Sequence, residues 1–112
     1  MNTVFHVTSG DPDDQARALS SVGNLLSDDT VALDDVAFVA NSSAVRMFLR
    51  GATNAPQIRS LAENGVAFKA CSNSLQRVDI APEQLLGDVE VVSSGMGELT
   101  RLQSTGYAYI RL

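Results

Sequence analysis

The sequence predicts an α/β fold built on one mostly parallel sheet. Short β-branched or apolar segments alternate with helix-like segments along the 112 residues, a pattern typical of βαβ units. Residues 35–40 (DVAFVA) are almost entirely apolar, which indicates a strand buried on both faces. Because the connections are short, we expect a three-layer, flavodoxin-like sandwich of about five mostly parallel strands. Helices should cover both faces, in a single domain over residues 1–112.

The first half of the chain contains two predicted strands. Residues 3–8 (TVFHVT) are β-branched and aromatic and are followed by a loop signal, SGDP, at 9–12. Residues 13–27 repeat apolar side chains at helical spacing and begin with acidic residues, which the helix dipole favours there. The strand at 35–40 is followed by a short helix that NSS at its start can cap, ending near Gly51.

The second half contains three more predicted strands, with short helices between them. Pro56 suits the first turn of a helix and Gly65 suits its end. The expected elements are then strand 66–71 (VAFKAC), one helical turn at 71–76, a short helix at 82–86, strand 89–92 (VEVV), a helix at 98–104 and strand 107–112 (YAYIRL).

Composition excludes several classes of function. Eight Lys and Arg against thirteen Asp and Glu give a net charge of −5, which argues against a nucleic-acid partner. One cysteine and one histidine exclude a disulfide framework and the common metal motifs, so we expect no metal and no cofactor. No apolar run is long enough to span a membrane, and the N-terminus lacks the basic region of a signal peptide. We therefore expect a cytoplasmic protein with no membrane partner.

The acidic residues are mostly short ones. Nine of the thirteen are Asp, and Lys69 is the one lysine against seven arginines. Strongly hydrated carboxylates with few lysine stems are consistent with adaptation to high salt. An ordinary acidic protein is the other interpretation.

Cys71 is the first candidate for chemistry. It ends a predicted strand and is followed by Ser72, Asn73 and Ser74, residue types that favour a helix N-cap. Ligands of open α/β sheets bind at the carboxyl ends of strands, and a helix N-terminus favours thiolate. The alternative is a small buried hydrophobic residue. Because there is no CxxC pair, a reactive Cys71 could carry sulfur as a persulfide or form a mixed disulfide with a partner.

Three further features could contribute to a site. Gly95 and Gly97 lie between a strand and a helix, where free N–H groups could bind an anion. They lack the GxGxxG and P-loop patterns, so a tight turn is the alternative. Ser9 and Gly10 would border the cleft of Cys71 if the first and third strands were neighbours, as in a flavodoxin-like order. His6 is interpreted as structural, placed mid-strand several residues below the strand's carboxyl end.

Residues 66–75 (VAFKACSNSL) resemble the DsrE/DsrF-like family of sulfur-relay proteins. The resemblance continues through 85–92, 94–99, 101–103 and 106–111, and more weakly through 39–45. It implies an α/β sandwich that assembles into trimers or hexamers, with a cysteine that carries persulfide sulfur. Cys71 occupies that position, and Asn73 and Ser74 match the residues after it. The sequence departs from the family pattern at Ser42, Ser93 and Leu112.

Two functions follow as hypotheses. The first is a sulfurtransferase-like sulfur-relay protein with Cys71 as the carrier, supported by Asn41, Asn73 and Ser74, with sulfur-donor and acceptor-thiol proteins as partners. The second is a non-catalytic oligomeric subunit that binds a small ligand or regulates a partner, with a structural Cys71. In either case the apolar C-terminal strand and the resemblance lead us to expect a homotrimer or homohexamer.

Overall fold

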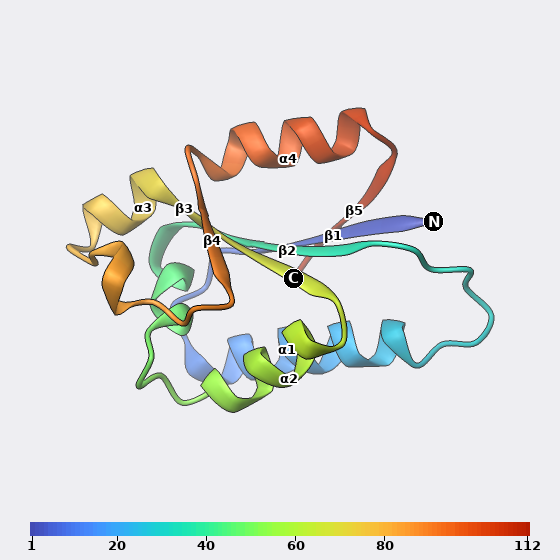
Figure 1. Cartoon of the computed structure of the whole chain (residues 1–112), viewed down its shortest axis with the longest axis horizontal. Coiled ribbons are helices and arrows are strands. Elements are labelled where there is room, and N and C mark those ends of the chain that lie inside the picture. The colour runs from blue at the N-terminus through green and yellow to red at the C-terminus, as the bar shows by residue number, and fades with distance from the viewer.

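The structure is a computed structural model that describes the whole chain, residues 1–112 (Figure 1). Five strands form one sheet in which every pairing is parallel, in the order β4-β3-β2-β1-β5. The strands are β1 (Asn2–Val7), β2 (Val36–Ala40), β3 (Val66–Cys71), β4 (Val89–Val92) and β5 (Tyr107–Arg111). This confirms the expected α/β class and places all five strands within one or two residues of their expected bounds.

The expected adjacency of the first and third strands is wrong. β2 lies between them, with Phe38 opposite Phe5 on one side and Phe68 on the other. The free edge of β1 is filled by β5 instead. Hydrophobic pattern identifies a segment as a strand, but it does not state which neighbour the strand pairs with.

The helical segments connect successive strands. They are α1 (Pro12–Leu26), η1 (Ser42–Phe48), α2 (Ala55–Glu63), α3 (Ser72–Arg77), η2 (Pro82–Gln84) and α4 (Gly95–Ser104). η1 and η2 are 3₁₀ turns. α1 begins one residue before its expected start, with Pro12 in the first turn and the Asp11 side chain accepting the N–H of Asp13. None of these helices is long and apolar enough to cross a membrane.

The two faces of the sheet differ in what they bury. α1 and α2 cover one face and α4 the other (Figure 1). The first face holds the larger core, with 21 buried residues, in which the rings of Phe38, Phe48 and Phe68 pack against one another. Below α4 the apolar cluster is much smaller, with four buried residues, Val4, Ala37, Val39 and Leu99. Polar side chains occupy much of the remaining space on this face, and the candidate site lies there.

Candidate functional site

Cys71 lies where β3 ends and α3 begins. It is the last strand residue and also the N-cap of α3, with extended backbone angles. Its placement at the carboxyl edge of the sheet agrees with the sequence prediction. The residue is only 5% exposed, so its thiol has little access to solvent.

Donors from two helices surround the Cys71 sulfur. Burial raises the pKa of the thiol, but the Ser74 hydroxyl and the backbone N–H groups of Gly95, Ser74 and Asn73 act in the opposite direction. Together they outweigh burial, and the pKa lies below that of an ordinary cysteine. The first turns of α3 and α4 therefore both favour the thiolate at this position.

Ser74 connects the thiol to the loop after β2. Its Oγ accepts the backbone N–H of Ser42 at 2.8 Å, which leaves its own hydrogen available for the sulfur. Ser42 reaches this position with a φ of 54°, in the left-handed region that favours glycine. That conformation gives a physical reason for the glycine that the family pattern often has here.

Gly95 allows the first turn of α4 to approach the sheet closely. A Cβ at this position would lie 3.3 Å from the Cβ of Asn41 and 3.5 Å from the Cβ of Cys71. Asn41 and Cys71 thus contact the same point of α4 from neighbouring strands. Gly97 lies further along the turn, and its N–H caps the helix by donating to Ser94 Oγ at 2.9 Å.

His6 belongs to this region, which the sequence interpretation missed. It is the penultimate residue of β1, so its placement several residues below the strand end was wrong. Its Nε2 lies 2.7 Å from Asn41 Oδ1, and its Nδ1 lies 2.6 Å from the hydroxyl of Tyr109. With Asn41 Oδ1 as acceptor, the network assigns the proton to Nε2, and the Tyr109 hydroxyl donates to Nδ1.

The surroundings of the His6 ring favour its neutral form. Burial lowers its pKa, the Asn41 hydrogen bond raises it, and the charge of Arg111 lowers it, with a net decrease. A signal for the site was present in the sequence, since His6 lies in the first predicted strand and Asn41 comes directly after the second. It became readable only with the pairing of β1 and β2, which sets His6 opposite Val39.

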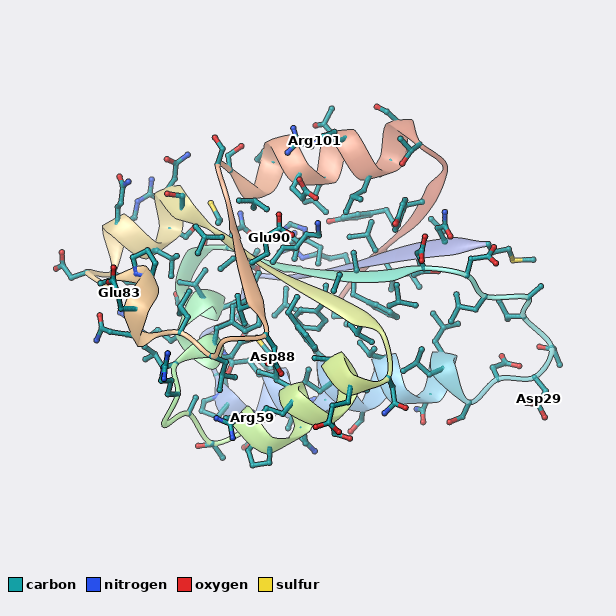
Figure 2. All side chains as sticks on the ribbon, viewed as in Figure 1. Asp29, Arg59, Glu83, Asp88, Glu90 and Arg101 are labelled. Carbon is teal, nitrogen blue, oxygen red and sulfur yellow. The ribbon has the colours of Figure 1, made fainter.

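A buried ion network holds α4 against β3 beside the cysteine. Lys69 Nζ lies 2.8 Å from Glu98 Oε2, and Arg101 lies 2.6 Å from the other carboxylate oxygen. Burial raises the pKa of Glu98, but the two cations outweigh it and hold that pKa low. Glu90, 3.4 Å from Lys69, completes the network at its exposed edge, and Figure 2 shows Glu90 on β4 and Arg101 on α4.

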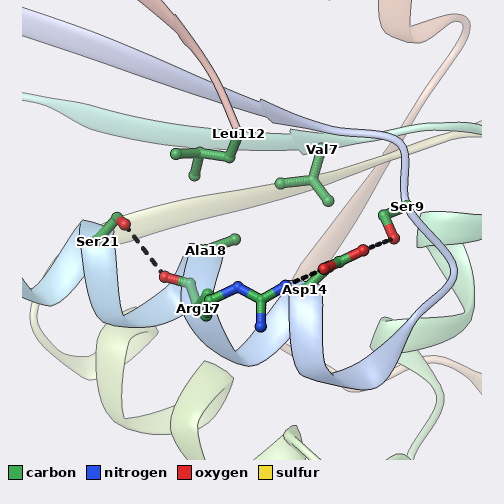
Figure 3. A pocket seen from close by; sticks show the side chains of 7 residues that line it. All are labelled: Val7, Ser9, Asp14, Arg17, Ala18, Ser21 and Leu112. Carbon is green, nitrogen blue, oxygen red and sulfur yellow. Dashed lines mark hydrogen bonds and ion pairs between the residues drawn. The ribbon is translucent and has the colours of Figure 1, made fainter.

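Ser9 and Gly10 lie elsewhere, because β2 separates β1 from β3. Ser9 donates to Asp14, which also pairs with Arg17, along a cavity of about 400 Å³ between α1 and the end of β5 (Figure 3). Gly10 packs against Ser43 of η1, whose Cβ is 2.8 Å from the position a Gly10 Cβ would take. Of the residues proposed from sequence, Asn41, Cys71, Asn73, Ser74 and Gly95 come together, with Gly97 one step behind them.

Residues 1–112 match the sequence profile of the DsrE/DsrF-like family over their whole length. The chain belongs to the DsrE/DsrF-like family. Membership associates the protein with sulfur relay in general terms. No curated protein has a significantly similar sequence.

Solved structures resemble this DsrE/DsrF-like chain along nearly all of its length. MTH1491 from Methanobacterium thermoautotrophicum, described as a protein of unknown function, has a TM-score of 0.92 at 35% identity over 99% of this chain and 98% of that chain. The ychN protein from E. coli has a TM-score of 0.82 at 19% identity over the whole of both chains. BT1422 from Bacteroides thetaiotaomicron, a conserved protein of unknown function, has a TM-score of 0.71 at 14% identity, covering 97% and 94%. The last two share the fold.

Proposed function

We propose that this DsrE/DsrF-like protein is a sulfur-relay protein that carries sulfane sulfur as a persulfide on Cys71. The observation that carries the proposal is the set of donors around Cys71, which lowers the pKa of its thiol despite burial. Thiolate is the form that attacks sulfur electrophiles. The residues that supply the donors come from α3 and α4, so the fold itself prepares the nucleophile.

Both steps of the relay are exchanges between a thiolate and a persulfide. In loading, the Cys71 thiolate attacks the outer sulfur of a donor persulfide, R–S–SH. The new S–S bond forms as the donor S–S bond breaks, and R–S⁻ leaves with the electron pair. In unloading, an acceptor thiolate attacks the outer sulfur of Cys71–S–SH, and the Cys71 thiolate leaves. There is no net oxidation, and the four donors stabilise Cys71 both as attacking and as leaving group.

Mass spectrometry of the intact protein tests the proposal directly. Reduced protein treated with polysulfide should gain the mass of one sulfur atom, and reductant should remove it. The Cys71→Ser variant should gain nothing. An unmodified wild-type protein under all loading conditions would refute the carrier function.

A second function is favoured by the burial of Cys71, which is 5% exposed and packed at the edge of the core. In that case the protein is a non-catalytic oligomeric subunit that binds a small ligand or regulates a partner, and Cys71 is structural. Alkylation separates the two. A thiol that iodoacetamide modifies only after denaturation supports the binding subunit, and modification of the native protein at a low thiol pKa supports the carrier.

The proposal includes partners and assembly. The partners are a sulfur donor and an acceptor thiol protein, and the protein is a homotrimer or homohexamer. Support for assembly comes from β5, an edge strand with exposed Tyr109 and Ile110, next to the exposed Leu112. Light scattering at moderate and high salt tests this, and a monomeric mass at both would contradict it.

A further inference from the structure

The side-chain amide of Asn41 lies beside Cys71 and has a free donor. Asn41 follows β2 directly, and because Ala40 is opposite Ala70, it is level with Cys71 on the neighbouring strand. Both side chains lie on the α4 face, where Gly95 contacts them. The single hydrogen bond of the Asn41 side chain is the one that its Oδ1 accepts from His6.

The bond to His6 fixes which way the amide faces. The two polar atoms of an amide diverge from Cγ, so an Oδ1 directed toward β1 leaves Nδ2 on the side of β3. Nδ2 makes no hydrogen bond within the chain, and it is not among buried polar atoms that lack a partner, so it remains accessible. His6 is itself 4% exposed and is held at its other nitrogen by Tyr109. The amide therefore has a defined orientation and two donor hydrogens to offer.

Loading moves the negative charge away from the donors that serve the thiolate. In the reduced protein the charge is on Sγ, where Gly95, Ser74 and Asn73 act. In a persulfide anion the charge is on the outer sulfur, about 2 Å further out. A donor that makes no bond to Sγ but lies level with it suits this second position.

We propose that Asn41 donates from Nδ2 to the outer sulfur of the Cys71 persulfide, and that His6 is the positioning residue that holds the Asn41 amide in this orientation. The inference rests on the proposed carrier function and adds residues specific to its loaded state. With the Nε2 proton of His6 donated to Asn41 Oδ1, the Tyr109 hydroxyl is the donor to Nδ1 and holds the ring from its other side.

This arrangement predicts that two properties of Cys71 respond differently to the same variants. The thiol pKa depends on donors from α3 and α4, so replacing His6 or Asn41 should leave the thiol pKa unchanged. The equilibrium between Cys71 and a persulfide donor should shift against loading, by about tenfold for one hydrogen bond to a charged group. Damage to the fold around Cys71 would instead change both properties together.

The experiment equilibrates each protein with glutathione persulfide and glutathione and measures the loaded fraction by intact mass. His6→Leu removes the Nε2 donor to Asn41, and Asn41→Leu removes the amide; both keep a side chain of similar bulk. Both variants should have a loaded fraction reduced in line with the tenfold shift. His6→Gln should recover much of it, because its Nε2 can reach Asn41 Oδ1. Tyr109→Phe removes the hydroxyl, and Tyr107→Phe on the same strand is its matched control. In parallel, the pH dependence of alkylation by iodoacetamide reports the thiol pKa of each variant.

The outcomes distinguish this inference from the function on which it rests. If wild-type protein is not loaded, the carrier function and the inference both fail. If wild-type protein is loaded and His6→Leu and Asn41→Leu match it, the inference alone is overturned. A loss of loading accompanied by an equal change in thiol pKa, or a His6→Gln variant as impaired as His6→Leu, also overturns it. Reduced loading with an unchanged thiol pKa and rescue by His6→Gln supports it.

Discussion

Replacing Gly95 by alanine tests how closely α4 approaches the cysteine. The new Cβ would lie 3.3 Å from Asn41 Cβ and 3.5 Å from Cys71 Cβ, at or below the ~3.5–4.0 Å preferred by non-bonded carbons. Overpacking of this kind costs about 1–3 kcal/mol. The helix preference of alanine over glycine, up to about 1 kcal/mol, offsets part of it. We expect a net loss of about 1 kcal/mol in the free energy of unfolding.

The same substitution should change the chemistry of Cys71. Relief of the contact moves the first turn of α4 outward, which weakens the action of the Gly95 N–H on the sulfur and raises the thiol pKa. Gly23→Ala is the matched control, because it lies in α1 with no heavy atom near its Cβ position. This control should gain up to about 1 kcal/mol and leave the thiol pKa unchanged.

Two assays on the two variants decide the matter. Urea unfolding measures stability, and the rate of iodoacetamide alkylation against pH measures the thiol pKa. If Gly95→Ala is stabilised like Gly23→Ala and has a wild-type thiol pKa, then α4 does not approach Cys71 in the way that the structure shows. A loss of stability with an unchanged thiol pKa would support the close contact of α4 with Cys71 but would refute an effect of the Gly95 N–H on the thiol pKa.

Three further predictions concern the surroundings of the site. Ser42 and Asp79 have φ values of 54° and 58°, so Ser42→Gly and Asp79→Gly should each raise stability in urea by about 1 kcal/mol, and no gain at either would refute the strain. Ser74→Ala removes the acceptor of the Ser42 N–H and a donor to sulfur, so it should raise the thiol pKa, whereas Ser72→Ala should leave it unchanged; equal effects would contradict the assignment. Glu98→Gln should cost about 2 kcal/mol near neutral pH. The pKa of Glu98 in the folded protein lies below that of an unfolded glutamate. Its contribution to stability is therefore present above the unfolded pKa and is lost as pH falls through the folded pKa. The stability of Glu98→Gln should then fall less steeply in acid than that of the wild type, and parallel curves for the two proteins would contradict this prediction.

The ion network and the site share one helix, which links stability to reactivity. Lys69 lies two residues before Cys71 on β3, and Glu98 lies one turn after Gly95 on α4. The Lys69–Glu98 ion pair therefore helps to fix the distance between α4 and β3, the strand that ends at Cys71. Polar groups dominate this side of the sheet because the apolar cluster beneath α4 is small, with four buried residues.

Much of the candidate site could be predicted because it is contiguous in sequence. Cys71, Asn73 and Ser74 follow an apolar strand and begin a helix, and both features depend on local backbone preferences. Gly95 was identified by its position between a strand and a helix. Its contact with Cys71 could not be derived, because it depends on how α4 crosses the sheet.

The errors came from strand order and from side-chain position along a strand. Ser9 and Gly10 were placed near Cys71 through an assumed pairing of the first and third strands, and β2 occupies that place. His6 was placed several residues below the end of its strand, and the structure puts it next to that end, in contact with Asn41. Both errors concern contacts between segments that are distant in sequence.

The sequence by itself determined the five strands, the helices between them and the cysteine at the end of the third strand. Periodicity, caps and turns are local properties, so a single chain segment carries them. Only the tertiary structure decided the order β4-β3-β2-β1-β5, the placement of Gly95 over Asn41 and Cys71, and the line of hydrogen bonds from Tyr109 through His6 to Asn41. These depend on which strand edges pair and which face a crossing helix covers, and that choice is made by burial of the whole chain at once.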